Sequence, residues 1–281
     1  MPLSSMHDML IPARKSGTAV GAFEVWDLAS VQMMIAAAEE LSQPVILQMS
    51  PYEIKLAGVR DLAEIVISHA RRATVPVALH LDHGDTFDRV LECIHAGFTS
   101  VMLDASHLPF DGNVAATREV VRAAHACGVS VEAELGRIGG SETGVDLTDD
   151  ESALTDPDEA GAFVAETRID ALAVAVGTVH GFYKGEPNVR LPLLEKIAEE
   201  VSIPLVLHGG SGTPDDVVRK AVTLGVAKVN ICTEVLAAWI DRFIAHRAEP
   251  DFRFFTVDIF SPPIAAAKEV VLEKIRLLAG N

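Results

Sequence analysis

Three histidines follow short apolar runs at widely separated places in the chain. His83 lies in the segment HLDHGD, His180 in GTVHGFYKG and His208 in LHGGSG. Three converging imidazoles leave one coordination position of a zinc ion open, which is the pattern of a catalytic rather than a structural zinc site. One such histidine alone is more often a side chain in an ordinary hydrogen bond. Three in equivalent positions favour a metal centre.

Several carboxylates accompany the same apolar runs. Asp82 directly precedes the first of these histidines and is placed to relay a proton to and from a substrate hydroxyl, unless it only orients a zinc ligand. Glu132 and Glu134 alternate to one face of VSVEAEL, and Asp104 ends SVMLDA. These three acids could hold a second cation, orient ligands, or form an ionic layer inside the fold. His80 alternates with Asp82 and is interpreted as a structural or supporting histidine.

The elements that must position these side chains repeat along the whole chain. Near-continuous Val, Ile and Leu runs, each followed by a stretch with helical periodicity, predict parallel strands buried on both faces. Eight such units close naturally into a (β/α)8 TIM barrel, an α/β fold, and we expect residues 1–281 to form one domain. An extra C-terminal helix is predicted over 262–278, with Pro262 and Pro263 at its start. The eight predicted strands are 19–25, 44–49, 76–82, 100–105, 129–135, 171–176, 204–209 and 227–232.

A glycine-rich turn after the seventh predicted strand indicates a phosphate site. GGSG is followed by Thr213 and Pro214, which resemble the start of a helix, and Asn230 and Thr233 end the eighth strand. The loops after strands seven and eight form the recurrent phosphate site of these barrels, where backbone N–H groups bind the anion. A glycine turn elsewhere would indicate only a turn. The active residues of such barrels lie at this same rim.

Composition excludes several classes of partner. The formal net charge of −17 argues against binding to nucleic acid or an anionic membrane surface. No apolar run reaches about 18 residues, so no membrane span is expected. The first residues lack the apolar core of a secretory signal. Three widely spaced cysteines form neither a disulfide framework nor a CxxC zinc site, and we expect a cytoplasmic protein.

Six collinear segments resemble the class II fructose- and tagatose-bisphosphate aldolase family, and the likeness covers nearly the whole chain. The segments are HLDHGDTFD, SVMLDASHLPFDGN, VSVEAELGRIGG, AVAVGTVHGFYKG, PLVLHGGSG and KVNICTE. The resemblance implies a TIM barrel, a catalytic Zn²⁺ ion and a homodimer or homotetramer. It also implies reversible cleavage of fructose 1,6-bisphosphate or tagatose 1,6-bisphosphate into dihydroxyacetone phosphate and an aldehyde, glyceraldehyde 3-phosphate.

The resemblance also implies roles for individual residues. His83, His180 and His208 would bind the zinc, which acts as a Lewis acid on the ketone carbonyl. Asp82 would be the acid/base on the C4 oxygen. Glu142 lies in the long segment 136–156 between the fifth strand and the next helix, where the family carries the base that moves the α-carbon proton.

The remaining implied site residues bind substrate or further cations. Asp104 and Glu134 match positions linked to a second or alternative metal location, and some family members bind Na⁺ or K⁺ near the phosphate loop. The residues implied in binding the ketone phosphate and other parts of the substrate are Ser50, Gly181, Gly209, Gly210, Ser211, Asn230, Cys232 and Thr233.

Departures from the family pattern leave the aldehyde partner open. Cys232 stands where a fructose-bisphosphate subgroup places Asp, and Glu24 stands where many members have Asn. Pro51 and Tyr52 follow Ser50 where a small residue is common. Fructose 1,6-bisphosphate, tagatose 1,6-bisphosphate and a deoxy-sugar-acid phosphate therefore all remain candidate substrates.

Two rival interpretations give other functions to the same fold. A Schiff-base aldolase needs a desolvated lysine inside the barrel, and we expect Lys228 in the eighth strand to lack supporting acid/base neighbours. A non-catalytic barrel subunit would have no need of the histidine trio, Asp82 and Glu142. Both rivals are therefore disfavoured.

Overall fold

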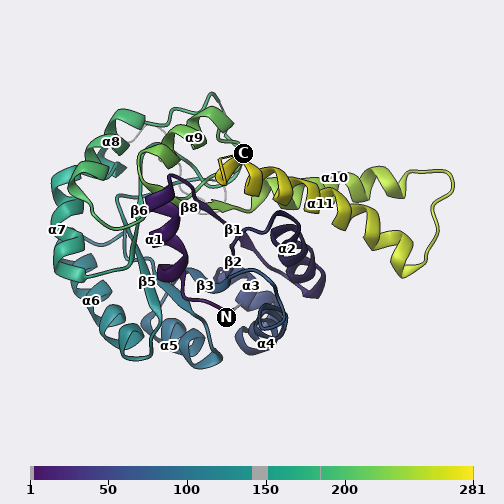
Figure 1. The fold of residues 1–281 in the computed structure, drawn as a ribbon, viewed down its shortest axis with the longest axis horizontal. Coiled ribbons are helices and arrows are strands. Elements are labelled where there is room, and N and C mark those ends of the chain that lie inside the picture. Colours follow the sequence, from purple (N-terminus) through teal and green to yellow (C-terminus); the bar gives the residue numbers. More distant parts are fainter. Residues whose placement is uncertain (1–2, 141–150, 184, 281) are drawn as a thin grey trace.

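The computed structural model describes residues 3–140, 151–183 and 185–280, and these form a closed barrel of eight parallel strands in sequence order (Figure 1). Each strand begins and ends within two residues of the predicted run, so the predicted (β/α)8 TIM barrel is confirmed. The strands are β1 (Val20–Glu24), β2 (Val45–Met49), β3 (Val77–Gly84), β4 (Ser100–Leu103), β5 (Ser130–Leu135), β6 (Ala171–Val174), β7 (Leu205–Leu207) and β8 (Val226–Ile231).

Helices surround the barrel and bury their apolar faces against the strands. Several begin at a side-chain cap: Asp27 accepts from the N–H of Ser30, and Thr86 accepts from that of Arg89. None of the helices within the described ranges is long and apolar enough to cross a bilayer. The surrounding helices are α2 (Leu28–Leu41), α3 (Pro51–Ala57), α4 (Val59–Ala70), α5 (Phe87–Ala96), α6 (Phe110–Ala126), α7 (Pro157–Thr167), α8 (Leu191–Glu200) and α9 (Asp215–Thr223).

An N-terminal helix, α1 (Met6–Ser16), lies across the end of the barrel where the strands begin (Figure 1). Just before it, the N–H of Ser4 donates to the carbonyl of Val77, the first residue of β3. The buried side chains of α1, among them Met6 and Leu10, pack on small inward residues of the strands. Helix α1 therefore closes this end of the barrel by filling the space beside its small alanine side chains. An open cavity can form only at the opposite rim, where the strands end.

The C-terminal helix differs from its prediction. Helix α11 (Thr256–Leu278) begins six residues before the expected start, so both prolines lie inside it. Pro262 cannot donate to the carbonyl of Asp258 four residues earlier. The Nε2 of His246, on α10 (Thr233–Arg247), lies 2.6 Å from that carbonyl and donates to it instead. Together α10 and α11 form a hairpin that extends well beyond the barrel (Figure 1).

Two glycines let the loop after β6 pass close to its neighbours. Gly140 forms a bridge with His180, whose N–H donates to the carbonyl of Gly139 at 2.9 Å. A Cβ on Gly140 would collide with the backbone of His180, and one on Gly209 with the backbone of Val179. Both glycines also have positive φ angles, which other residues rarely adopt. The loop that carries His180 is thus held between the loops after β5 and β7.

The close backbone approach at Gly209 predicts that two glycine substitutions lower the free energy of unfolding by different amounts. Gly128 has φ 73° and nothing within 4 Å of a Cβ, so Gly128→Ala should lose about 1–2 kcal/mol of unfolding free energy from backbone strain alone. Gly209→Ala carries the same strain and a backbone collision, and should lose distinctly more. Urea denaturation of the two variants measures the difference. Equal losses of unfolding free energy in the two variants would mean that the close approach at Gly209 does not contribute to stability.

Candidate metal centre and active site

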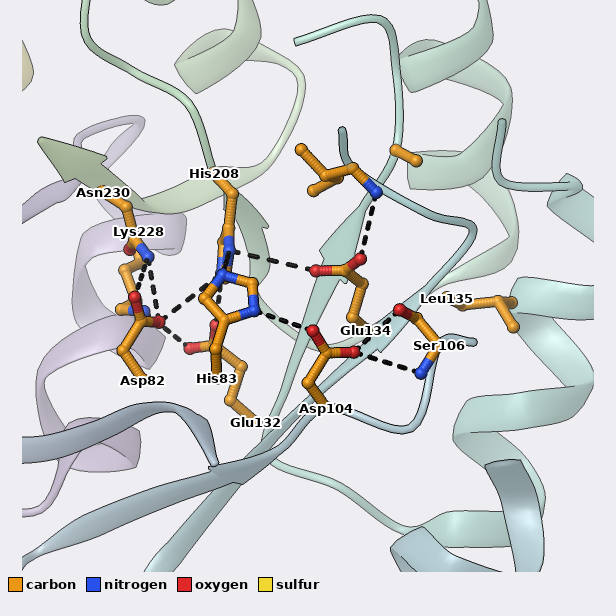
Figure 2. Close-up of polar contacts among 12 residues, drawn as sticks. Asp82, His83, Asp104, Ser106, Glu132, Glu134, Leu135, His208, Lys228 and Asn230 are labelled. Atoms are coloured by element: carbon orange, nitrogen blue, oxygen red, sulfur yellow. Dashed lines mark hydrogen bonds and ion pairs between the residues drawn. The ribbon is translucent and has the colours of Figure 1, made fainter. Parts of the chain in front are cut away.

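The structure brings the three predicted histidines together at the barrel rim (Figure 2 shows His83 and His208). One ring nitrogen from each of His83, His180 and His208 lies within 4.8 Å of the others. The rings meet edge to face, with centroids 4.6–5.7 Å apart. His208 directly follows β7, but His180 lies six residues beyond the end of β6, in the clamped loop rather than at a strand end. The three nitrogens can serve one ion.

An irregularity at the end of β3 directs His83 into the site. Strict alternation would send Asp82 and His83 to opposite faces of the strand. His83 instead has φ 46°, an uncommon conformation for a residue with a side chain, and the register against β4 shifts between Leu81 and Gly84. Both Asp82 and His83 therefore face the same site (Figure 2). Backbone strain at this position is typical of functional residues.

In two of the histidines, the ring nitrogen that points away from the other rings forms a hydrogen bond to a carboxylate. His83 Nδ1 lies 2.8 Å from Asp104 Oδ2, and His208 Nε2 lies 2.8 Å from Glu132 Oε1. An ionised carboxylate only accepts, so each of these nitrogens carries the hydrogen. The inner nitrogens, His83 Nε2 and His208 Nδ1, then face each other at 2.8 Å. This arrangement of ring nitrogens fits a metal ion, since carboxylates placed in this way fix the ring orientation of metal-bound histidines.

The site concentrates negative charge around His83. Burial opposes the charged form of this histidine, but Asp82, Asp104 and Glu134 raise its pKa to about 10. Burial and the neighbouring Asp104 raise the pKa of Glu134 to about 8. Asp104, Glu134 and His83 also form a second group with metal-ligand spacing, so the two acids predicted for a second metal location lie side by side. Such a site attracts a cation.

Asp82 is buried and held by two amide side chains. Gln48 Nε2 donates to its Oδ2 at 3.0 Å, and Asn230 Nδ2 donates to its Oδ1 at 3.1 Å. Burial would raise the pKa of Asp82, but the nearby histidines and Lys228 lower it far below its usual range. The same Gln48 amide donates to Glu24 Oε1 at 2.9 Å. Sequence reasoning missed Gln48, although a lone amide in the apolar run PVILQM was a usable signal.

Most of the predicted phosphate-binding residues line one small pocket beside Asp82 and His180. Gly210 is an exception: its N–H donates to the carbonyl of Asn230, so its amide is already engaged. The N–H of Gly212 likewise donates to Glu234 Oε1 at 2.6 Å. The predicted residues that line this pocket are Gly181, Gly209, Ser211, Asn230, Cys232 and Thr233.

A wider cavity of about 680 Å³ opens next to the small pocket, a size typical of small-molecule sites. Ser50 lines it, and the Ser50 hydroxyl contacts Glu53 within the N-terminal cap of α3. Burial, followed by the charges of Glu53 and Asp82, raises the pKa of Glu24 well above its usual range. The described lining residues contain no lysine or arginine, and the acids among them are Glu24, Glu53, Asp82, Asp85 and Asp104.

The expectation for Lys228 was wrong. Its side chain is fully buried inside the barrel, and its Nζ lies 2.9 Å from Glu132 Oε2. Burial would raise the pKa of Glu132, but Lys228 and His208 lower it to about 2. His80, the supporting histidine, lies in the same layer, with Nδ1 2.8 Å from Ser100 Oγ. Inward alternation on strands far apart in sequence brings these groups together, which local sequence cannot reveal.

Glu142, the predicted proton-transfer base, lies outside the described residues. The preceding segment reaches the site at Ile138, whose N–H donates to Glu134 Oε1 at 3.2 Å. The next described element is a short 3₁₀ helix, η1 (Glu151–Ala153).

Comparison with known proteins agrees with this geometry. The family described as fructose-bisphosphate aldolase class-II matches residues 4–281. The chain is 42% identical over 281 residues to the fructose-bisphosphate aldolase of Staphylococcus aureus strain Mu50, covering 98% of this chain and 96% of that protein. It is 44% identical over 282 residues to a probable fructose-bisphosphate aldolase of Bacillus subtilis strain 168, covering 98% and 97%.

Solved structures of proteins described as aldolases share this fold. The crystal structure of the YdjI aldolase from Escherichia coli K12 superposes with a TM-score of 0.87 at 33% identity, covering 98% of this chain and 97% of that one. A putative fructose-1,6-bisphosphate aldolase from Coccidioides immitis superposes with a TM-score of 0.86 at 32% identity, covering 97% and 95%. The chain therefore belongs to the class II fructose-bisphosphate aldolase family and is a carbon–carbon lyase.

Proposed function

We propose that this enzyme catalyses zinc-dependent, reversible aldol cleavage of a ketose bisphosphate. The substrate is fructose 1,6-bisphosphate or tagatose 1,6-bisphosphate, and the products are dihydroxyacetone phosphate and glyceraldehyde 3-phosphate. The observation that carries the proposal is the convergence of three imidazole nitrogens beside a buried, oriented Asp82 and a glycine-rich pocket. Relatives named fructose-bisphosphate aldolases support the choice of substrate.

His83, His180 and His208 would hold the zinc ion. When bound there, it supplies a Lewis acid for the ketone carbonyl. Asp104 and Glu134 lie beside His83 and would serve a second or alternative metal position. Na⁺ or K⁺ near Gly181 and Gly209 remains part of this proposal.

Asp82 exchanges the proton on the C4 oxygen. Amide donors on both of its oxygens hold the carboxylate in one orientation beside the histidines. In the cleavage direction Asp82 accepts the hydroxyl proton, and in synthesis it returns a proton to the same oxygen. Glu142 moves the proton on the α-carbon of the ketone half. Two groups thus divide the two proton transfers.

The small pocket binds the ketone phosphate through backbone N–H groups and hydroxyls. It is formed by the loop after β7 and the start of α10, the usual phosphate site of this barrel. Ser211 and Thr233 supply hydroxyls, and glycines allow close approach of the phosphate to the backbone. Phosphate bound here orients the reacting carbons toward Asp82. Ser50 would bind a substrate hydroxyl in the wider cavity.

We also propose a homodimer or homotetramer. The hairpin of α10 and α11 leaves large apolar side chains in solvent, including Phe254, which is 77% exposed. Isolated apolar residues at a surface are ordinary, but a group on a projecting hairpin is typical of an association surface. The other exposed members are Ile240, Ile244, Phe255, Val257 and Phe260.

The activity itself is tested by a coupled cleavage assay on a panel of ketose phosphates. We expect cleavage of fructose or tagatose 1,6-bisphosphate, loss of activity after chelation, and recovery on adding zinc. A preference for a deoxy-sugar-acid phosphate would keep the chemistry and change the substrate. Chelator-resistant cleavage, or no cleavage of any member by zinc-loaded protein, would contradict the proposal.

The division of labour between Asp82 and Glu142 predicts failure at different steps. Asp82→Ala should reduce cleavage about 10²–10⁴-fold, the usual contribution of a general acid/base, while exchange of the ketone α-proton with solvent continues. Glu142→Ala should reduce exchange and cleavage together and leave zinc content unchanged. Isotope exchange of dihydroxyacetone phosphate, followed by NMR, separates the two. Parallel losses in Asp82→Ala would reduce Asp82 to a metal-orienting role, and wild-type exchange in Glu142→Ala would assign the base elsewhere.

A further inference from the structure

A buried charged pair lies inside the barrel next to His208, one of the three converging histidines (Figure 2). Lys228 lies on β8 and Glu132 on β5, and their side chains meet at 2.9 Å between Nζ and Oε2. Both side chains are fully buried. The second carboxylate oxygen, Glu132 Oε1, lies 2.8 Å from His208 Nε2. Glu132 therefore joins a buried cation to one of the three converging histidines.

The contact to His208 has a chemical consequence. A neutral imidazole carries one hydrogen, and only the other nitrogen can bind a metal. A carboxylate at Nε2 accepts that hydrogen and leaves the lone pair on Nδ1. Nδ1 is the nitrogen that faces His83 Nε2. Because His208 is fully buried, no solvent is available to stabilise the alternative tautomer.

Lys228 compensates the buried charge of Glu132. Burying a carboxylate without a compensating cation carries a large desolvation cost. The Lys228 ammonium offsets the charge of Glu132 on the side away from the histidine. Lys228 thus meets one carboxylate oxygen of Glu132, while the other oxygen faces His208.

We propose that Glu132 and Lys228 form a positioning pair that holds His208 in the tautomer presenting Nδ1 to the metal. The proposal rests on the proposed function, because it requires a metal at the three histidines. It assigns Lys228 a role in metal affinity rather than in Schiff-base chemistry. The competing role is a core ion pair that stabilises the barrel and leaves metal binding unaffected.

Zinc affinity separates the two roles. The zinc dissociation constant is measured by competition with a chromophoric chelator, using zinc alone and the full-length protein. Glu132→Gln places an amide against Nε2 that can either accept or donate, and we expect zinc binding about 10- to 100-fold weaker, as for other partners of metal-bound histidines. Thr167→Val is the matched control, because it removes another buried side-chain hydrogen bond, from Thr167 on α7 to the carbonyl of Phe163, away from the histidine trio.

A double variant keeps the test decisive if a lone buried charge prevents folding. Glu132→Gln combined with Lys228→Met carries no unpaired charge, and we expect its zinc binding to be weakened as much as in Glu132→Gln, because the contact to His208 is made by Glu132. ¹⁵N NMR of the histidine rings should show hydrogen on Nε2 of His208 in zinc-loaded wild type. Wild-type zinc affinity in the double variant, or hydrogen on Nδ1, would overturn the pair's role. Wild-type protein that binds no zinc would overturn the proposed function as well.

Discussion

The site depends on one constraint of buried imidazoles: a ring binds a metal only through the nitrogen that carries no hydrogen. The hydrogen on the opposite nitrogen therefore needs an acceptor. Asp104 accepts from His83, and Glu132 accepts from His208. Asp104 lies just beyond the end of β4 and Glu132 lies within β5, so neighbouring strands of the closed barrel supply both acceptors. The carboxylates that orient the rings also lend the centre the negative charge that a cation requires.

The backbone also helps to bring the histidine rings together. His83 reaches the site through a left-handed φ at the end of β3. His180 reaches it from a loop that Gly140 and Gly209 allow to pass against neighbouring backbone. Helix α1 fills the opposite end of the barrel, so polar side chains and open space gather at one rim. The positions of the three rings therefore depend on backbone strain at His83 and on close backbone packing at two glycines that are not themselves ligands.

Sequence alone predicted the barrel, the histidine trio and the neighbouring acids, because apolar runs report buried strands and polar residues at their ends report the rim. It placed the start of α11 six residues late, since a hydrogen bond from His246 to the carbonyl that Pro262 leaves free is a tertiary contact. It also misjudged Lys228, whose partner Glu132 is three strands away around the barrel. Contacts between distant strands leave no local signature.

In the proposed metal centre three imidazoles, and no thiolate, bind the zinc ion. X-ray absorption at the zinc edge, on protein loaded with one equivalent of zinc, tests it most directly. We expect three imidazole nitrogens at about 2.0–2.1 Å from the zinc ion, with oxygen or nitrogen atoms completing the coordination shell. A sulfur neighbour at about 2.3 Å, which would place the metal on Cys232, or a shell with fewer than two imidazoles, would contradict it.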